Sequence, residues 1–183
     1  MIIGLTGRIA SGKGEVAKYF QNKGFDYISL SMAVREEAEK LGIGITRESL
    51  QNLGNKRREE EGAGIWAIKT SEKIDESRNY VIDGIRNPAE ILAFRGFNDF
   101  YLLSVDAGFE IRADRAIARG KQSDPKTIEE FRRLDERDFG VREPFNGQQV
   151  GLCMNFADYH FFNNGSVGEL HGKLDRFYNN LKC

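Results

Sequence analysis

Gly7-Arg8-Ile9-Ala10-Ser11-Gly12-Lys13-Gly14 follows an apolar run, Met1 to Leu5, and opens an amphipathic stretch. A strand, a glycine-rich turn and a helix in this order allow backbone N–H groups and a helix N-terminus to surround a phosphate group. Lys13 adds a mobile cation for the outer phosphates. The alternative is an ordinary glycine-rich turn with a solvated lysine. We interpret the stretch as the phosphate-binding loop of a nucleotide-binding protein.

One position departs from the usual form of such a loop. Residue 14 is glycine, so the hydroxyl that commonly ligates Mg²⁺ next to the lysine is missing.

Length and composition limit the class of protein. A chain of 183 residues is expected to form one domain around one core. Its net charge of -1 gives no general basic field, so a nucleic-acid partner is not expected. No apolar run approaches the roughly 18 residues of a membrane span. The two cysteines, Cys153 and Cys183, cannot build a disulfide framework, and we expect a reducing, cytoplasmic location.

Strand and helix signals alternate along the chain, which favours an α/β fold with a five-stranded parallel sheet flanked by helices. Strands are expected over 2–6, 25–30, 80–84, 100–105 and 159–162. Helices are expected over 12–23, 88–95, 109–119 and 148–156, and after a capping box formed by Ser166 and Glu169. A further helix is expected to begin with Asp124 as N-cap and Pro125 at the first helical position, and to end near Gly140.

The core is predicted to be interrupted twice. Residues 31–78 are charge-rich and contain no convincing strand, which indicates a helical insertion, while 112–140 form two polar helices typical of a mobile lid. The core would then comprise 1–30, 79–111 and 141–183.

Asp83 ends a buried strand, and the carboxyl end of that strand would lie beside the loop if the two strands are neighbours. There its carboxylate would hold Mg²⁺, directly or through water. The alternative is an Asx turn before Gly84. Arg86 projects from the same edge and suits a bidentate phosphate contact, and Arg35 on the next helix would reach the same space.

Arg112, Arg115 and Arg119 are spaced to share one helical face. They form either a salt-bridged surface, neutralised by Asp114, Asp124 and Asp135, or a lid that stabilises charge on transferring phosphates. We favour the second interpretation for Arg115 and Arg119. His160 and His171 are interpreted as structural.

These segments resemble the P-loop nucleoside and nucleotide monophosphate kinases, because Gly12-Lys13-Gly14 follows the adenylate kinase form and Asp83-Gly84-Ile85-Arg86 is similar to that family's Asp-Gly-x-(Pro)-Arg segment. Within the superfamily, the chain is most similar to archaeal adenylate kinase-related proteins, themselves similar to dephospho-CoA kinases. Further similar segments are 32–37, 87–90, Arg119-Gly120-Lys121 with Asp124-Pro125, and Asn163-Asn164-Gly165-Ser166.

The resemblance implies that residues around 31–77 bind the acceptor and that Arg35 and Arg86 hold its phosphate. It also implies that Asp83 organises Mg²⁺ and that Arg115, Arg119 and Arg137 close over ATP. Four features depart from the family pattern: Glu15, Ser31, Leu134 and the loop segment Arg8-Ile9-Ala10-Ser11.

The sequence therefore predicts an ATP- and Mg²⁺-dependent kinase acting on a nucleoside monophosphate or a nucleotide-like small molecule, with the acceptor left open among AMP, other nucleoside monophosphates, deoxynucleotides and dephospho-CoA. Its catalytic residues would be Lys13, Asp83, Arg115 and Arg119, and Arg112 and Arg137 would belong to the lid. ATP would contact Gly7, Arg8, Ile9, Ala10, Ser11, Gly12, Lys13, Gly14, Glu15, Arg119 and Asn163. The alternatives are a nucleotide-binding switch or assembly ATPase with slow hydrolysis and, suggested by the missing hydroxyl, a non-catalytic binder.

Overall fold

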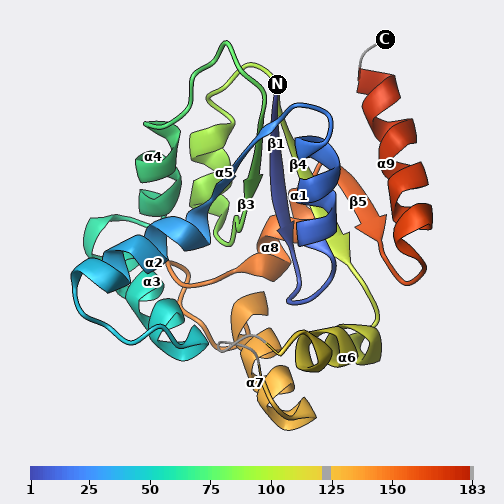
Figure 1. The fold of residues 1–183 in the computed structure, drawn as a ribbon. Coiled ribbons are helices and arrows are strands. Elements are labelled where there is room, and N and C mark those ends of the chain that lie inside the picture. Colours follow the sequence, from blue (N-terminus) through green and yellow to red (C-terminus); the bar gives the residue numbers. More distant parts are fainter. Residues whose placement is uncertain (121–124, 182–183) are drawn as a thin grey trace.

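The strand that precedes the glycine-rich loop, β1 (Ile2–Gly7), is buried along its whole length and lies at the centre of a parallel five-stranded sheet. The sheet order is β2-β3-β1-β4-β5, with β2 (Asp26–Ser29), β3 (Tyr80–Asp83), β4 (Phe100–Asp106) and β5 (Tyr159–Phe162). The computed structural model describes residues 1–120 and 125–181 (Figure 1). The predicted five-stranded parallel α/β fold is confirmed.

Side chains that alternate along β1 serve two cores, one on each face of the sheet. Ile3 and Leu5 pack with α1 (Lys13–Gln21) and α9 (Val167–Leu181). Ile2 packs on the opposite face, whose core also takes in residues of α5 (Pro88–Phe94) and α8 (Val150–Asn155). The sheet is therefore the middle of three layers.

Three helices connect β2 to β3, in the segment that we expected to form a helical insertion. They are α2 (Leu30–Lys40), α3 (Arg47–Glu61) and α4 (Ile65–Ser71). Trp66 is fully buried, and its indole N–H donates to the carbonyl of Gly54 at 3.1 Å, which fixes α4 against α3. A buried ion pair between Arg58 and Glu90, 2.8 Å, fastens the insertion to α5.

Helices α6 (Phe109–Arg119) and α7 (Ile128–Phe139) lie beyond the carboxyl end of β1, beneath the loop (Figure 1). The predicted start of the second helix is wrong, because Thr127 is the N-cap and its hydroxyl accepts from the amide of Glu130 at 3.1 Å. Proline has no side-chain oxygen that could accept such a bond, and Pro125 lies before the N-cap, outside the helix. Asp124 and Lys121 lie outside the described residues. The predicted lid boundary at 112 falls inside the continuous helix α6.

Two other helix starts match their sequence signals. Asn87 caps α5 by accepting from the amide of Ala89, with Pro88 at the first helical position. Ser166 and Glu169 form the expected capping box before α9. Within 1–120 and 125–181, no helix combines the length and the apolarity needed to cross a membrane. Cys153 is buried with a free thiol, and Cys183 is outside the described part of the chain.

Candidate functional site

The loop that follows β1 depends on two glycines with positive φ. At Gly7, φ is 134° and a Cβ atom would lie 2.0 Å from the carbonyl oxygen of Val105. At Gly12, φ is 109° and a Cβ atom would lie 2.2 Å from the amide nitrogen of Asn163. Asn163 is buried and donates to the carbonyl of Ser11 at 2.9 Å. Asn163 thus supports the loop and is not among the residues that line the cavity described below, and its contact with ATP stays a prediction.

Lys13 folds back over the loop. Its Nζ donates to the carbonyls of Gly7 at 2.6 Å and Arg8 at 2.7 Å, and leaves one N–H for a third acceptor. Desolvation lowers the pKa of Lys13 to about 8, although the charges of Asp83 and Asp138 act in the opposite direction. Gly12 gives α1 no side-chain cap, so no capping side chain covers the N-terminal end of this helix, where Lys13 stands.

An outer cavity of about 630 Å³ lies over the loop. Six of the residues that we expected to act on phosphates line it together: Lys13, Arg35, Asp83, Arg86, Arg115 and Arg119. The loop contributes 9–15, where Glu15 forms an ion pair with Lys18 at 2.9 Å.

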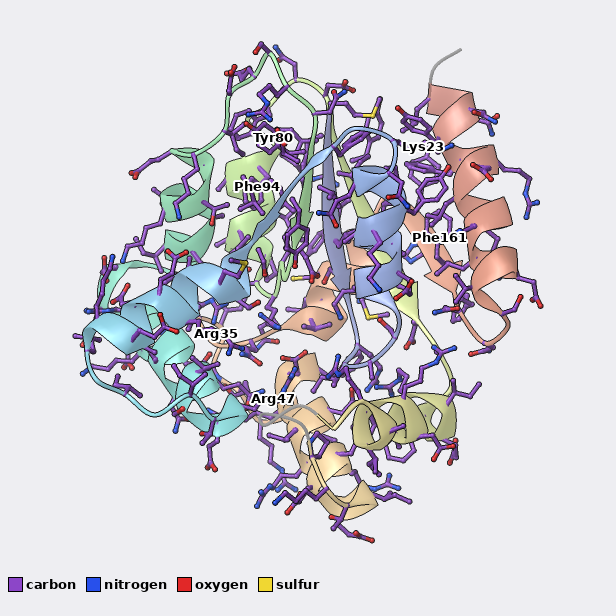
Figure 2. The ribbon with its side chains drawn as sticks, viewed as in Figure 1. Lys23, Arg35, Arg47, Tyr80, Phe94 and Phe161 are labelled. Carbon is purple, nitrogen blue, oxygen red and sulfur yellow. The ribbon has the colours of Figure 1, made fainter. Side chains whose placement is uncertain are left out.

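A smaller inner cavity of about 110 Å³ adjoins it under α2 and α3. Ser31, Arg35, Arg47 and Arg86 line both cavities. Figure 2 shows Arg35 and Arg47 on the insertion, on the side of the molecule that carries α6 and α7. Three arginines therefore stand where the two cavities meet.

Asp83 lies at the carboxyl end of β3, in register with Leu5 of β1. Its Oδ1 is buried and makes no hydrogen bond within the described chain, while Tyr27 Oη lies 3.5 Å from Oδ2. Tyr27 lines the same cavity, and burial, together with the Asp83 charge, raises the pKa of Tyr27. A buried carboxylate oxygen left without a donor needs a partner from outside the chain.

Arg86 is held at its backbone and at its side chain. Its amide donates to Glu90 Oε2 at 2.7 Å, and its carbonyl accepts from the amide of Gln149 at 2.6 Å. Its Nε lies 3.2 Å from Asp138 Oδ1. Glu90 thus holds the backbone of Arg86, and Asp138 holds its guanidinium at the junction of the cavities.

Arg112 is buried and makes its contacts within the segment that we expected to form the lid and with the loop. Its Nη2 donates to Asp135 Oδ2 at 3.0 Å, and its Nη1 donates to the carbonyl of Ile9 at 3.3 Å. Arg8 reaches the same Asp135 carboxylate at 2.7 Å and stacks on Phe139. The salt-bridge interpretation of the arginine stripe thus holds for Arg112.

The other arginines of α6 and α7 that we expected to close over ATP differ in their position relative to the outer cavity. Arg115 and Arg119 line the outer cavity, and Nη1 of Arg115 is buried without a hydrogen bond among the residues described. Arg137 lines neither cavity and binds Glu143 at 3.0 Å and Asn52 at 2.8 Å. In this arrangement Arg137 links α7 to α3, and its contact with ATP remains a prediction.

The sequence interpretation missed residues that reach the cavities only through tertiary contacts. Arg47 is the first residue of α3, and Asp138 lies near the end of α7. Gln51 and Gln148 are 97 residues apart, yet their amides are 3.2 Å apart. No local signal marks these four residues.

Gly14 and Ser11 are the positions relevant to the hydroxyl that commonly ligates Mg²⁺ in such loops and is missing from this one. A Cβ atom on Gly14 would meet nothing within 4 Å, and no positive φ is required there. Ser11 Oγ is buried and has no hydrogen-bond partner in the described chain, and Ser11 lines the outer cavity.

Comparison with known proteins places this geometry in context. The family model of the AAA domain matches residues 3–138. A UPF0200 protein of Pyrococcus horikoshii is 39% identical, with 96% of this chain and 95% of that protein covered. A UPF0200 protein of Hyperthermus butylicus is 31% identical, with 99% and 95% covered.

Solved structures agree in fold. A Thermus thermophilus protein has a TM-score of 0.61 at 22% identity, covering 99% of this chain and 97% of that one. The shikimate kinase of Acinetobacter baumannii, solved with shikimate, has a TM-score of 0.57 at 15% identity, covering 99% and 94%. The gluconokinase of Sinorhizobium meliloti has a TM-score of 0.55 at 14% identity, covering 98% and 94%. The chain thus has a P-loop NTPase, kinase-like fold.

Proposed function

The chain belongs to the AAA-domain family and to the UPF0200 proteins, and from this premise we propose that it transfers the γ-phosphoryl group of ATP to a nucleoside monophosphate or nucleotide-like acceptor. The supporting observation is the pair of adjoining cavities that share Arg35, Arg47 and Arg86. A hydrolytic switch needs the loop cavity alone. A transferase needs a second compartment that opens onto the first where cations stabilise the transferred group.

The residues divide by task. The loop 7–15, with Lys13, would hold the ATP phosphates by backbone amides and one cation. Arg35 and Arg86 would hold the acceptor phosphate, and Arg47 adds a third cation at their junction. Arg115 and Arg119 would neutralise charge that spreads over the transferred oxygens. The arginines thereby bring together two anions that repel each other.

The described residues fit Mg²⁺. Asp83 offers a buried carboxylate oxygen that lacks a donor, and hard oxygen ligands are what Mg²⁺ prefers. No cluster of three or more His, Cys, Asp or Glu residues that could hold a metal occurs in 1–120 and 125–181. The ion would take its other ligands from water and substrate phosphates. When bound, the ion would withdraw charge from the phosphate oxygens.

The central test measures ADP release from ATP and Mg²⁺ with and without acceptor. We expect nucleoside monophosphates to raise ADP formation above the solvent-only rate, with a phosphorylated product of matching mass, and EDTA to abolish both. Hydrolysis unaffected by any acceptor would favour a nucleotide-binding switch or assembly ATPase.

The lowered pKa of Lys13 predicts a pH dependence of ATP affinity. Lys13 carries its charge below about pH 8 and loses it above, and only the ammonium form attracts phosphate. The Kd for ATP should therefore rise at least about fivefold between pH 7.5 and 9.5. Isothermal titration calorimetry measures this change.

Lys13→Arg is the matched control for that prediction, because guanidinium stays protonated throughout this pH range. Its Kd for ATP should vary by less than about twofold. Equal pH dependence in both proteins would show that another group is titrating.

A further inference from the structure

The inner cavity contains two glutamines from distant parts of the chain. Gln51 lies on α3, Gln148 precedes α8, and both are buried. Gln51 Nε2 donates to Gln148 Oε1 at 3.2 Å, while Gln51 Oε1 is buried and has no hydrogen-bond partner in the described chain. A buried amide oxygen without a donor is costly unless a bound molecule supplies one.

The hydrogen-bonding capacity of this pair is the same if both amides are turned together, because their mutual bond is then kept with the donor and acceptor exchanged. One mutual N–H···O bond uses one NH₂ group and one oxygen, and it leaves the other oxygen and the other NH₂ group. These remaining groups form an acceptor beside a donor. Nucleobase edges carry the complementary pattern, an N–H donor beside a ring nitrogen or a carbonyl oxygen.

Charge is distributed unevenly between the two compartments. The arginines at the junction face both cavities, whereas the inner cavity alone adds uncharged Val34, Leu50 and Gly54 beside the glutamines. The remaining inner charges are paired, Arg58 with Glu90 and Asp138 with Arg86. An acceptor would therefore turn its phosphate toward the loop and an uncharged, hydrogen-bonding group inward.

We propose that Gln51 and Gln148 bind the base edge of a nucleoside monophosphate and that the inner cavity is its nucleobase pocket. This inference rests on the proposed function and narrows it, because the acceptor must carry a base in addition to its phosphate. Gln51 and Gln148 are then specificity-determining residues, and phosphate esters without a base are poor acceptors.

Gly54 provides a way to fill this pocket without disturbing the protein. A Cβ atom there would lie 3.5 Å from Arg58 Nη1, 3.8 Å from Trp66 Nε1 and 4.0 Å from Val34 Cγ1, all ordinary contacts. Two of these neighbours also line the inner cavity. Gly54→Ala should therefore favour the helix while it competes with the bound base for space.

The test is equilibrium binding to the full chain, measured by calorimetry with AMP, GMP, CMP, UMP and base-free ribose 5-phosphate. In the unmodified protein one monophosphate should bind at least about tenfold more tightly than ribose 5-phosphate. Gln51→Leu, Gln148→Leu and Gly54→Ala should each raise the Kd of that monophosphate at least about tenfold. The Kd of ribose 5-phosphate should change by less than about twofold. The matched control, Gln21→Leu at an exposed site on α1, should change neither.

Thermal melting confirms that each variant is folded, and Gly54→Ala tests the pocket even if a glutamine variant is unstable. Ribose 5-phosphate that binds as tightly as every nucleotide, or variants that weaken all ligands equally, would overturn the nucleobase pocket while leaving phosphoryl transfer intact. Base-selective binding without any transfer would refute the proposed function and keep the pocket. Absence of binding by every monophosphate would refute both.

Discussion

Lys13→Ala is expected to lower phosphoryl transfer by about 10²–10³-fold, because the loop would lose the one cation that it places at the outer phosphates. The variant should fold normally. Lys13 is desolvated, as its lowered pKa shows, and its removal takes a charge out of a site where charge is disfavoured. Initial rates of ADP formation with the best acceptor, together with a thermal melt, measure both effects.

Lys56→Ala is the control for this substitution. Lys56 lies on α3, outside both cavities, with 68% of its side chain exposed, and pairs only at the surface with Glu60. Its loss should leave the rate within about twofold of the unmodified protein. A Lys13→Ala variant that retains more than a third of the rate would contradict the assignment of the loop.

The second large effect concerns stability. Asp135→Ala should lower the free energy of unfolding by about 3–5 kcal/mol, because it leaves a buried guanidinium without its partner. Asp135 is 2% exposed, and it binds both Arg112, which is 3% exposed, and Arg8 from the loop. Urea denaturation followed by circular dichroism measures the change.

Asp114→Ala is the matched control, an exposed aspartate on α6, and should change the free energy of unfolding by no more than about 0.5 kcal/mol. Asp135→Asn keeps a hydrogen-bond acceptor but removes the charge. Its loss in the free energy of unfolding should lie between those of Asp114→Ala and Asp135→Ala. A loss below about 1 kcal/mol for Asp135→Ala would show that Arg112 finds another partner or reaches water.

The fold could be predicted largely because its signals are local. The apolar run before Gly7, the strand that ends at Asp83 and the capping residues Asn87 and Ser166 each mark an element within a few neighbours. The predicted start of α7 was wrong because the sequence offers two N-cap candidates within four residues, Asp124 and Thr127. The side chain of Thr127 accepts from the amide of Glu130, and this bond, rather than Pro125, sets the boundary.

The site was only half predictable. Lys13, Asp83 and Arg86 lie at or beyond the carboxyl ends of β1 and β3, which are neighbours in a parallel sheet, so their convergence follows from topology. Arg112 could not be separated from Arg115 because helical spacing does not tell which side of a stripe is buried. Gln51 and Gln148 meet across the insertion and the core, and no residue near either one in sequence indicates the other.

The open space around Gly14 distinguishes a steric requirement for glycine at this position from a difference in how the loop binds its metal ion. Because neither packing nor backbone geometry demands glycine there, the architecture would accept serine or threonine as readily. Steric necessity therefore does not explain the glycine at residue 14. A serine or threonine can be introduced there without altering the rest of the loop, so the contribution of a single hydroxyl to metal binding can be measured separately.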